Sequence, residues 1–232
     1  MLALIAPSGA GKSSFLRAGL LPTLPRGWKA LIATPGNRPF QSLAHALAPA
    51  FAGDAQAVQA LLRFEDADTA VSLLQRFRQR HEHALVILDQ FEELFTLSPP
   101  AVQQAFAGLL GRLVLEADLH VILSLRDDFL FRCQDHAALV PAFSDLTPLP
   151  TLGTSGLRRA LVQPALACGY RFEDEALVDE MVAEVRKEKG ALPLLAFAAA
   201  RLWETRDREK GLLTRETYRE IGGVAGALAQ HA

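Results

Sequence analysis

The stretch Ala6-Pro7-Ser8-Gly9-Ala10-Gly11-Lys12-Ser13 joins a short apolar run, Leu2 to Ala6, to a helical pattern that extends from Lys12 to Leu21. Glycines let the backbone turn tightly enough for successive N–H groups to face one small volume, and a helix that starts there adds the positive end of its dipole. Lysine and serine at the helix start supply a cation and a hydroxyl ligand for Mg²⁺. Strand, glycine-rich loop and helix in this order form the Walker A pattern, which predicts binding of a nucleoside triphosphate through its phosphates.

The loop departs from the Walker A pattern at one position, because Ala6 stands where the pattern has its first glycine. Alanine fits there if the backbone keeps a negative φ. In this hypothesis Lys12 reaches the β- and γ-phosphates and Ser13 coordinates Mg²⁺. The alternative is a glycine-rich turn that caps a helix, with Lys12 in solvent; the agreement between motif and context favours phosphate binding. The residues predicted to contact the nucleotide are Pro7, Ser8, Gly9, Ala10, Gly11, Lys12, Ser13 and Ser14.

Outward from the loop, short apolar runs alternate with longer amphipathic stretches, which is typical of a parallel sheet flanked by helices. The predicted strands are Leu2 to Ala6, Ala30 to Thr34, Ala84 to Asp89 and Leu119 to Leu125, and the predicted crossover helices include Ala70 to Arg80 and Ala101 to Leu115. After the proline-rich passage Leu146 to Pro150 the strand patterns stop. Only helical patterns follow, over Leu157 to Cys168, Asp174 to Lys187 and Leu192 to Arg206. We therefore predict an α/β domain, a boundary near residue 150 and a smaller helical domain.

A second motif, this one acidic, lies at the end of the third predicted strand, where five apolar residues lead into Asp89. This is the form of a Walker B segment, whose aspartate holds Mg²⁺. If the chain coils helically after Asp89, Glu92 and Glu93 fall on the same side, so that three carboxylates gather at one spot around a cation. A solvated acidic face is the alternative. Many P-loop ATPases place a glutamate directly after the aspartate, where this chain has Gln90; Glu92 or Glu93 must therefore activate water, or hydrolysis is slow.

Two further positions have less specific patterns. Arg126 ends the fourth predicted strand, on the side where open α/β sheets bind ligands. It could read a γ-phosphate or form a surface ion pair with Asp127 or Asp128, and the residues do not decide between the two. Pro193 lies in the first turn of a predicted helix, where proline is common for reasons of helix geometry alone.

Composition describes an ordinary globular protein of 232 residues, with 50% hydrophobic residues, 22% charged residues and a net charge of −2. Nothing in it indicates a nucleic-acid or membrane surface, and no apolar run approaches the length of a membrane span. The two cysteines form no disulfide framework or metal motif. We expect a soluble, cytoplasmic protein that binds neither nucleic acid nor membrane directly.

Several strings taken together resemble the novel STAND NTPases, the signal-transduction ATPases with numerous domains, in order along essentially the whole chain. The strings are Ala6 to Pro22, Pro35-Gly36, Asp89-Gln90-Phe91-Glu92-Glu93-Leu94-Phe95-Thr96, Arg126-Asp127-Asp128-Phe129, Ala191-Leu192-Pro193-Leu194-Leu195, Leu202-Trp203 and Gly222-Gly223-Val224-Ala225-Gly226-Ala227-Leu228. The resemblance implies a P-loop core at 1–150 in which another strand separates the Walker A and B strands. It also implies a helical lid domain at 151–210 and the start of a winged helix at 211–232.

The resemblance also implies roles for single residues. Lys12 and Ser13 match the phosphate and magnesium ligands, Asp89 the Walker B aspartate, Arg126 the sensor arginine and Pro193 the proline that touches adenine. With Glu92 and Glu93 as candidates for water activation, the expected cofactors are ATP or ADP and Mg²⁺.

The function that the resemblance implies is an ATP-driven switch in signalling, with defence as one such role. ADP holds a closed monomer, and exchange for ATP opens it into an oligomer that activates a fused effector, with β-propeller repeats as a common fused sensor. Because family members have a Gly-Arg segment before the first strand and continue beyond the winged helix, we expect this chain to be a fragment. A nucleotide-locked scaffold without useful turnover and, less favoured, a small-molecule P-loop kinase are the alternatives.

Overall fold

The computed structural model describes residues 1–186, 188 and 190–229, and the chain divides into two compact units. The first unit comprises Met1–Pro7 and Lys12–Leu149, and the second comprises Pro150–Ala232 together with the loop residues Ser8–Gly11. No helix within the described residues is long and apolar enough to cross a bilayer.

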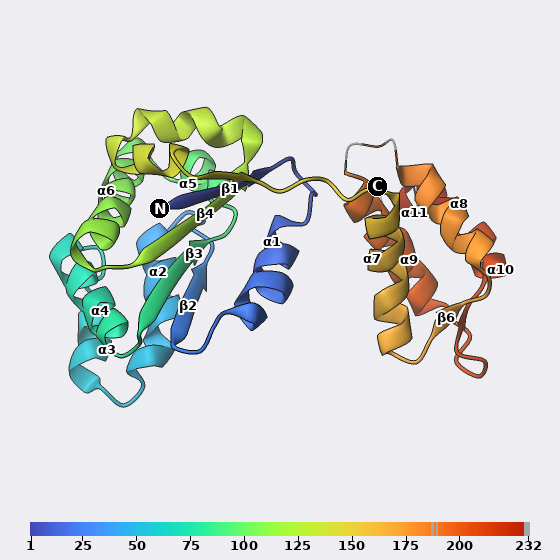
Figure 1. Ribbon diagram of the computed structural model, residues 1–232, viewed down its shortest axis with the longest axis horizontal. Helices are drawn as coiled ribbons and strands as arrows, with labels where there is room; N and C mark the ends of the chain where they lie inside the picture. The colour runs from blue at the N-terminus through green and yellow to red at the C-terminus, as the bar shows by residue number, and fades with distance from the viewer. Residues whose placement is uncertain (187, 189, 230–232) are drawn as a thin grey trace. The chain divides into compact units, whose positions relative to one another are not determined.

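The first unit is built on a five-stranded parallel sheet with the strand order β2-β3-β4-β1-β5 (Figure 1). The strands are β1 (Leu2–Ala6), β2 (Trp28–Ala33), β3 (His83–Leu88), β4 (His120–Arg126) and β5 (Leu146–Pro148). Strand β4 lies between β1, which leads into the glycine-rich loop, and β3, which leads into Asp89. This arrangement confirms the predicted α/β fold, with one strand inserted between the Walker A and Walker B strands.

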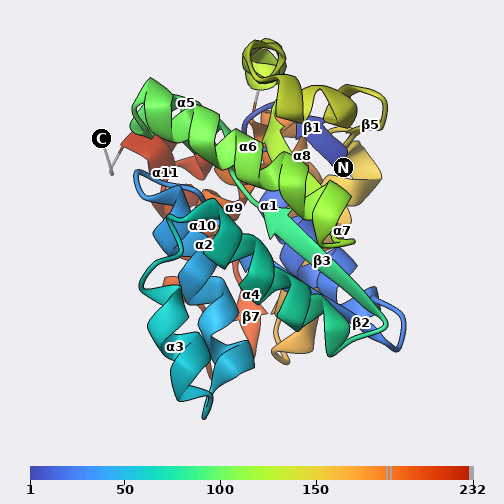
Figure 2. The same cartoon turned by 90° about the vertical axis from the view of Figure 1, so that its left-hand side faces the viewer.

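Helices cover both faces of this sheet, which explains why the strands read as continuous apolar runs. On one face, Ala84, Val86 and Leu88 of β3 belong to a large core with side chains from α2 (Pro39–Leu47), α4 (Ala67–Gln79) and α6 (Pro100–Glu116). In Figure 2, β3 is seen between α4 and α6. On the other face, Leu85 and Ile87 pack in a smaller cluster with Leu4 and Leu16. The alternation of residues along β3 between the two clusters follows from the period of two in a strand.

Strand β5 lies inside the proline-rich passage and was not among the predicted strands. Leu146–Pro148 pairs with Ala3 to Ile5 of β1 at the edge of the sheet. All three residues of β5 are exposed, so the strand has no apolar alternation, and Pro148 is tolerated because an edge strand does not need every N–H group. The other four strands were predicted within two residues at each end.

The predicted helix from Lys12 to Leu21 is real but irregular. It consists of the single α-turn α1 (Lys12–Ser14), the π-helical η1 (Phe15–Leu20) and the 3₁₀ turn η2 (Leu21–Thr23). The N–H group of Leu21 bonds to the carbonyl of Leu16, an i to i−5 contact. Pro22 follows directly, and a proline ring is incompatible with the regular i to i−4 pattern at that place. The remaining helices of this unit are α3 (Ala55–Leu61), α5 (Glu92–Leu97), η3 (Ala48–Phe51), η4 (Asp127–Asp135) and η5 (Ala137–Phe143).

The second unit is mainly helical, with one short two-stranded sheet. Its elements are α7 (Thr154–Ala167), β6 (Arg171–Phe172), α8 (Glu175–Val185), α9 (Ala191–Glu204), β7 (Leu212–Leu213), α10 (Arg215–Glu220) and α11 (Gly223–Ala229). The expectation of helices alone was wrong for β6 and β7, because two-residue strands are too short to show a period. Asp174 caps α8 by accepting from the N–H group of Leu177. Lys187, the predicted end of that helix, lies outside the described residues.

The described part of 211–232 packs within this second unit. Leu213, Tyr218 and Val224 belong to the same buried cluster as Leu177 of α8 and Leu202 of α9. Residues 230–232 lie outside the described residues. The assignment of 211–232 to the start of a winged helix, like the other predicted domain bounds, stays a prediction.

Candidate functional site

The loop that follows β1 has the backbone that its glycines predict. Gly9 and Gly11 have φ angles of +76° and +92°, which only glycine adopts readily. Within the described residues, the backbone N–H groups of Ser8, Gly9 and Gly11 donate no hydrogen bond. Ala6, the departure from the Walker A pattern, is not among the residues with positive φ, so alanine fits there without strain. A loop with free N–H groups and this curvature suits a phosphate group.

Lys12 is the only buried lysine or arginine among the residues that the structure describes, with 8% of its surface exposed. Its Nζ donates to the carbonyl oxygens of Ala6 at 2.8 Å and Pro7 at 3.2 Å, so the side chain folds back along the loop. Burial lowers the pKa of Lys12, and the negative charges of Glu92 and Asp127 oppose that shift. The ammonium is therefore held at the loop with two neutral acceptors that a phosphate oxygen could replace.

Asp89 is a buried carboxylate, 1% exposed, directly after β3. Its Oδ1 accepts hydrogen bonds from Ser13 Oγ at 3.1 Å, the N–H group of Gln90 at 3.1 Å and Ser124 Oγ at 3.3 Å. Its Oδ2 lies 3.7 Å from Nη2 of Arg17. The hydroxyl of the loop and the aspartate of the strand end, 76 residues apart, are thus in direct contact.

Ser124 and Arg17 contact Asp89 in the candidate site, and sequence reasoning missed both although each had a signal. Ser124 is the one polar residue inside the apolar part of β4, and it is fully buried. Arg17 stands four residues after Ser13, a spacing that places both side chains on one helix face. A search for lone polar residues in buried strands and for cations one turn after the loop would have found both.

The expected cluster of three carboxylates is absent. Within the described residues, no group of three His, Cys, Asp or Glu side chains could hold a metal ion. The reason lies at Gln90, whose φ of +54° breaks helical continuity between Asp89 and α5, which begins at Glu92. The Glu92 carboxylate instead accepts from the backbone N–H group of Arg126 at 3.3 Å, whereas the Glu93 carboxylate makes no hydrogen bond or ion pair with any described residue.

Arg126 forms a two-point ion pair with Asp128, with distances of 2.9 Å and 2.6 Å. This pair raises the pKa of Arg126, and the guanidinium also lies over the ring of Phe129. The surface ion pair, one of the two sequence-based alternatives, is therefore formed. A role toward a γ-phosphate stays a prediction, and it requires Arg126 to exchange Asp128 for the phosphate.

Comparison with known proteins places this geometry in a family. The family model described as Novel STAND NTPase 1 matches residues 1–232, the whole chain. The chain belongs to the novel STAND NTPase family. The resemblance inferred from the Walker strings is confirmed, and no curated protein matches the chain.

Solved structures share the fold of this STAND module at low sequence identity. A Walker-type ATPase of Pyrococcus abyssi has a TM-score of 0.65 and 13% identity, and the match covers 99% of this chain and 65% of that chain. Cdc6p from Pyrobaculum aerophilum has a TM-score of 0.61 and 13% identity, with 95% and 60% covered. The Orc1 protein of Aeropyrum pernix, solved in complex with DNA, has a TM-score of 0.58 and 18% identity, with 99% and 59% covered. The STAND module thus spans less than two thirds of each of these chains.

The oxygen atoms of Ser13 and Asp89 suit Mg²⁺ as hard ligands, since this ion prefers one or two protein oxygens together with phosphates and water. Their contact at 3.1 Å shows that one small cation could reach both. No third carboxylate is needed for such a site. Ser14, the last predicted contact residue of the loop, is exposed in α1.

Pro193 lies in the second unit of the STAND module, in the first turn of α9, as its position in the sequence predicted. The helix follows Gly190, whose φ of +90° turns the chain into it. A contact between Pro193 and a nucleotide base stays a prediction.

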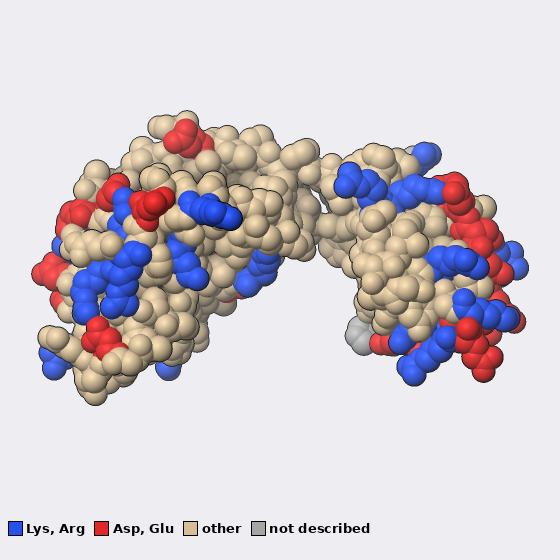
Figure 3. Space-filling model, turned by 60° about the horizontal axis from the view of Figure 1, so that its bottom comes forward, with Lys and Arg blue, Asp and Glu red and all other residues tan. Residues whose placement is uncertain are grey.

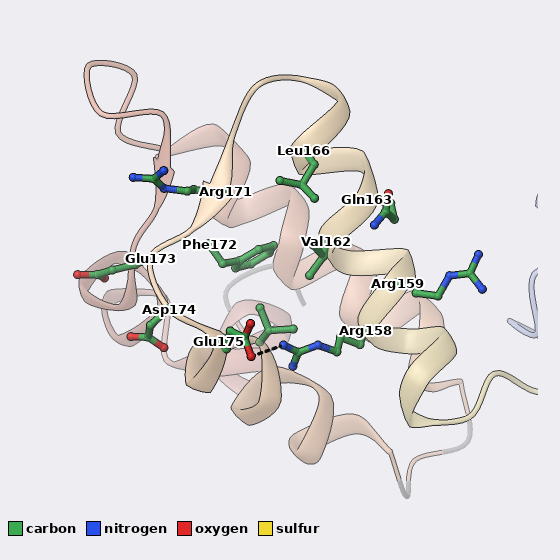
Figure 4. Close-up of a pocket in the computed structure, with 11 residues that line it drawn as sticks. Arg158, Arg159, Val162, Gln163, Leu166, Arg171, Phe172, Glu173, Asp174 and Glu175 are labelled. Atoms are coloured by element: carbon green, nitrogen blue, oxygen red, sulfur yellow. Dashed lines mark ion pairs between the residues drawn. The ribbon is translucent and has the colours of Figure 1, made fainter.

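The second unit also contains a groove of about 450 Å³ between α7 and the segment from β6 into α8 (Figure 4). Val162, Leu166 and Phe172 give it an apolar floor, and Arg158 pairs with Glu175 across one end at 3.1 Å. None of the residues predicted for the nucleotide site lines this groove. On the face shown in Figure 3, basic groups lie beside acidic ones, as the ion pairs of the chain require.

Proposed function

We propose that this STAND module binds ATP or ADP with Mg²⁺ and hydrolyses ATP slowly, as the switch of a signal-transduction protein. The observation that carries the proposal is the contact between Ser13 Oγ and Asp89 Oδ1 beside the buried ammonium of Lys12. In a P-loop NTPase the lysine contacts the phosphates, and the serine and the aspartate hold Mg²⁺, so these three side chains have to lie close together. Family membership supports an NTPase module independently.

Each residue has a physical role in this proposal. The N–H groups around Gly9 and Gly11 and the ammonium of Lys12 hold the phosphates, while Ser13 and Asp89 hold Mg²⁺. When bound, Mg²⁺ neutralises charge on the phosphate oxygens. The residues of the chain orient the phosphate tail, and Ser124 keeps the Asp89 carboxylate in one orientation by donating to Oδ1.

Slow turnover is supported by the state of the catalytic candidates. Glu92 is engaged with the backbone of Arg126, and Arg126 is engaged with Asp128. Glu93 carries the carboxylate that remains available to position or deprotonate water. A switch benefits from slow hydrolysis, because the lifetime of the ATP state sets the duration of the signal.

We further propose that the module works within a longer protein. In that protein ADP favours a closed monomer and ATP an open oligomer, and the switch acts on a fused effector under control of a fused sensor such as β-propeller repeats. A cytoplasmic location and a lack of direct contact with nucleic acid or membrane complete the proposal. Size-exclusion chromatography of the longer protein with ADP and with a non-hydrolysable ATP analogue tests it, and identical elution in both would contradict it.

Binding is tested with Lys12→Ala. The variant should lose ATP binding, measured by isothermal titration calorimetry, because it lacks the cation at the loop. Arg26→Ala is the matched control, since Arg26 is an exposed cation without an ion pair in the described part of the chain. Tight ATP binding that survives Lys12→Ala would sink the proposal.

A second candidate, a nucleotide-locked scaffold without useful turnover, is favoured by the engaged states of Glu92 and Arg126. Steady-state phosphate release separates the two functions. For an ATPase we expect Glu93→Gln to reduce phosphate release by about a hundredfold or more, the lower end of the roughly 10²–10⁴-fold contribution of a general base. Unchanged release in both Glu92→Gln and Glu93→Gln, at a rate no higher than background, would favour the scaffold.

A further inference from the structure

The two oxygens of the Asp89 carboxylate have different surroundings. Oδ1 accepts three hydrogen bonds, from Ser13, Ser124 and the N–H group of Gln90. Oδ2 accepts no hydrogen bond within the described residues, and its nearest charged partner is Nη2 of Arg17 at 3.7 Å. The side chain is only 2% exposed, so water contributes little to stabilising the charge at Oδ2.

The helix after the loop places Arg17 at this oxygen. Ser13 and Arg17 are four residues apart and lie on one face, so that the hydroxyl reaches Oδ1 and the guanidinium reaches Oδ2. Arg17 is 54% exposed in its side chain, and Asp89 is its ion-pair partner among the described residues. A long, exposed side chain of this kind can leave the carboxylate at low cost.

The other cations close to the site, Lys12 and Arg126, do not neutralise Asp89 in the structure. Arg126 forms its ion pair with Asp128. Lys12 directs its Nζ to the carbonyl oxygens of Ala6 and Pro7 and makes no ion pair with Asp89. A buried carboxylate without a cation is strongly unfavourable, so a protein without metal needs another positive group there. Arg17 is that group.

We propose that Arg17 is a built-in counter-ion of Asp89, which neutralises Oδ2 in the protein without metal and releases it when a divalent cation binds. Arg17 is thus a positioning residue that sets how strongly nucleotide affinity depends on Mg²⁺. This inference rests on the proposed function, because it needs Asp89 to hold the metal that accompanies the nucleotide.

The variant Arg17→Gln tests this role through ADP affinity, measured by calorimetry in EDTA and in saturating Mg²⁺. In EDTA the uncompensated Asp89 carboxylate then lies beside the phosphates, and ADP should bind about two- to fivefold more weakly, the range expected for one partly exposed ion pair. In saturating Mg²⁺ the metal supplies the missing charge, and affinity should equal that of the wild type or exceed it. Arg26→Gln, the matched control, should change neither value.

An equal loss of affinity in both conditions would mean that Arg17 contacts the phosphates, and it would overturn the inference. No change in either condition would overturn it as well. In the double variant Arg17→Gln with Asp89→Asn, the effect of losing Arg17 in EDTA should vanish, because no carboxylate is left to compensate. Failure of the wild type to bind ADP at all would overturn the proposed function and this inference together, whereas normal binding with one of the two contrary patterns overturns only the role of Arg17.

Discussion

The hydroxyl of Ser124 gives the sharpest test of how the Asp89 carboxylate is held. Ser124 is fully buried in β4 and donates to Oδ1 of Asp89 at 3.3 Å. Ser124→Ala removes this donor and leaves the carboxylate with the bonds from Ser13 and Gln90. Hydrogen bonds to charged groups contribute about 1.5–3 kcal/mol to stability. Because this bond is long and two other donors remain, Ser124→Ala should lower the free energy of unfolding by about 1.5 kcal/mol.

A matched control separates the contribution of the charge from that of any lost hydroxyl. Ser42 Oγ donates to the carbonyl oxygen of Pro35 at the same distance of 3.3 Å, but this acceptor is neutral and Ser42 is only half-buried. Ser42→Ala should therefore cost about 0.5–1 kcal/mol. Both serines lie in the first unit, so one assay serves for both.

Urea unfolding followed by tryptophan fluorescence is the assay, with a background that reports on one unit. The chain has two tryptophans, Trp28 in β2 and Trp203 in α9. A Trp203→Phe background leaves Trp28 as the reporter of the first unit, and an unchanged m-value shows that the same transition is compared. If Ser124→Ala costs no more than Ser42→Ala, the bond to Asp89 is not the charge-assisted contact that the geometry indicates.

Three further predictions follow from named contacts. Arg126→Gln removes a partly exposed ion pair with Asp128 and should change the free energy of unfolding by less than about 1 kcal/mol. If Arg126 contacts the γ-phosphate, this variant should also lose part of the preference for ATP over ADP in calorimetry, and an unchanged preference would exclude that role. The Glu184 carboxylate accepts a hydrogen bond at 3.0 Å from the N–H group of Val224, near the start of α11. Glu184→Gln should therefore lower the free energy of unfolding of the second unit, followed by Trp203 fluorescence, by about 1 kcal/mol, and no loss would show that this bond does not stabilise the unit. Because burial lowers the pKa of Lys12, the unfolded chain binds its proton more tightly than the folded one. Stability should then rise with pH between the lowered pKa and the ordinary value of 10.5, and Lys12→Met should abolish that rise; the same slope in both proteins would count against the shift.

Much of the fold was predictable because the signals that form it are local. A buried parallel strand such as β3 reads as an unbroken apolar run, and the glycine-rich loop marks the turn from β1 into its helix. Strand β5 was not predictable in this way, since its pairing with β1 depends on backbone groups and not on apolar side chains. The π-helical turn over Phe15–Leu20 likewise has no signature in a hydrophobic periodicity of 3.6.

The candidate site likewise contains residues with a local sequence signal and residues whose contacts depend on the fold. Lys12, Ser13 and Asp89 were predictable from motif and spacing, and the structure brings Ser13 and Asp89 into contact. The predicted carboxylate cluster was wrong because the positive φ of Gln90 turns Glu92 toward the backbone of Arg126, and a single backbone angle has no signature in the sequence. Ser124 and Arg17 have only weak signals in the sequence, a lone polar residue in an apolar strand and a cation four residues after Ser13, and the contacts with Asp89 appear only in the folded chain.

In the proposed function, Asp89 and the loop hydroxyl of Ser13 hold the metal that accompanies the nucleotide. The most direct measurement is the ratio of ATP affinities in saturating Mg²⁺ and in EDTA, determined by calorimetry for the wild type and for Asp89→Asn, which keeps the size of the side chain. If Asp89 holds the metal, the wild type should bind ATP more tightly with Mg²⁺, and Asp89→Asn should show a ratio near one with ATP still bound in EDTA. A variant that keeps the full Mg²⁺ dependence of the wild type would show that Asp89 does not hold the metal.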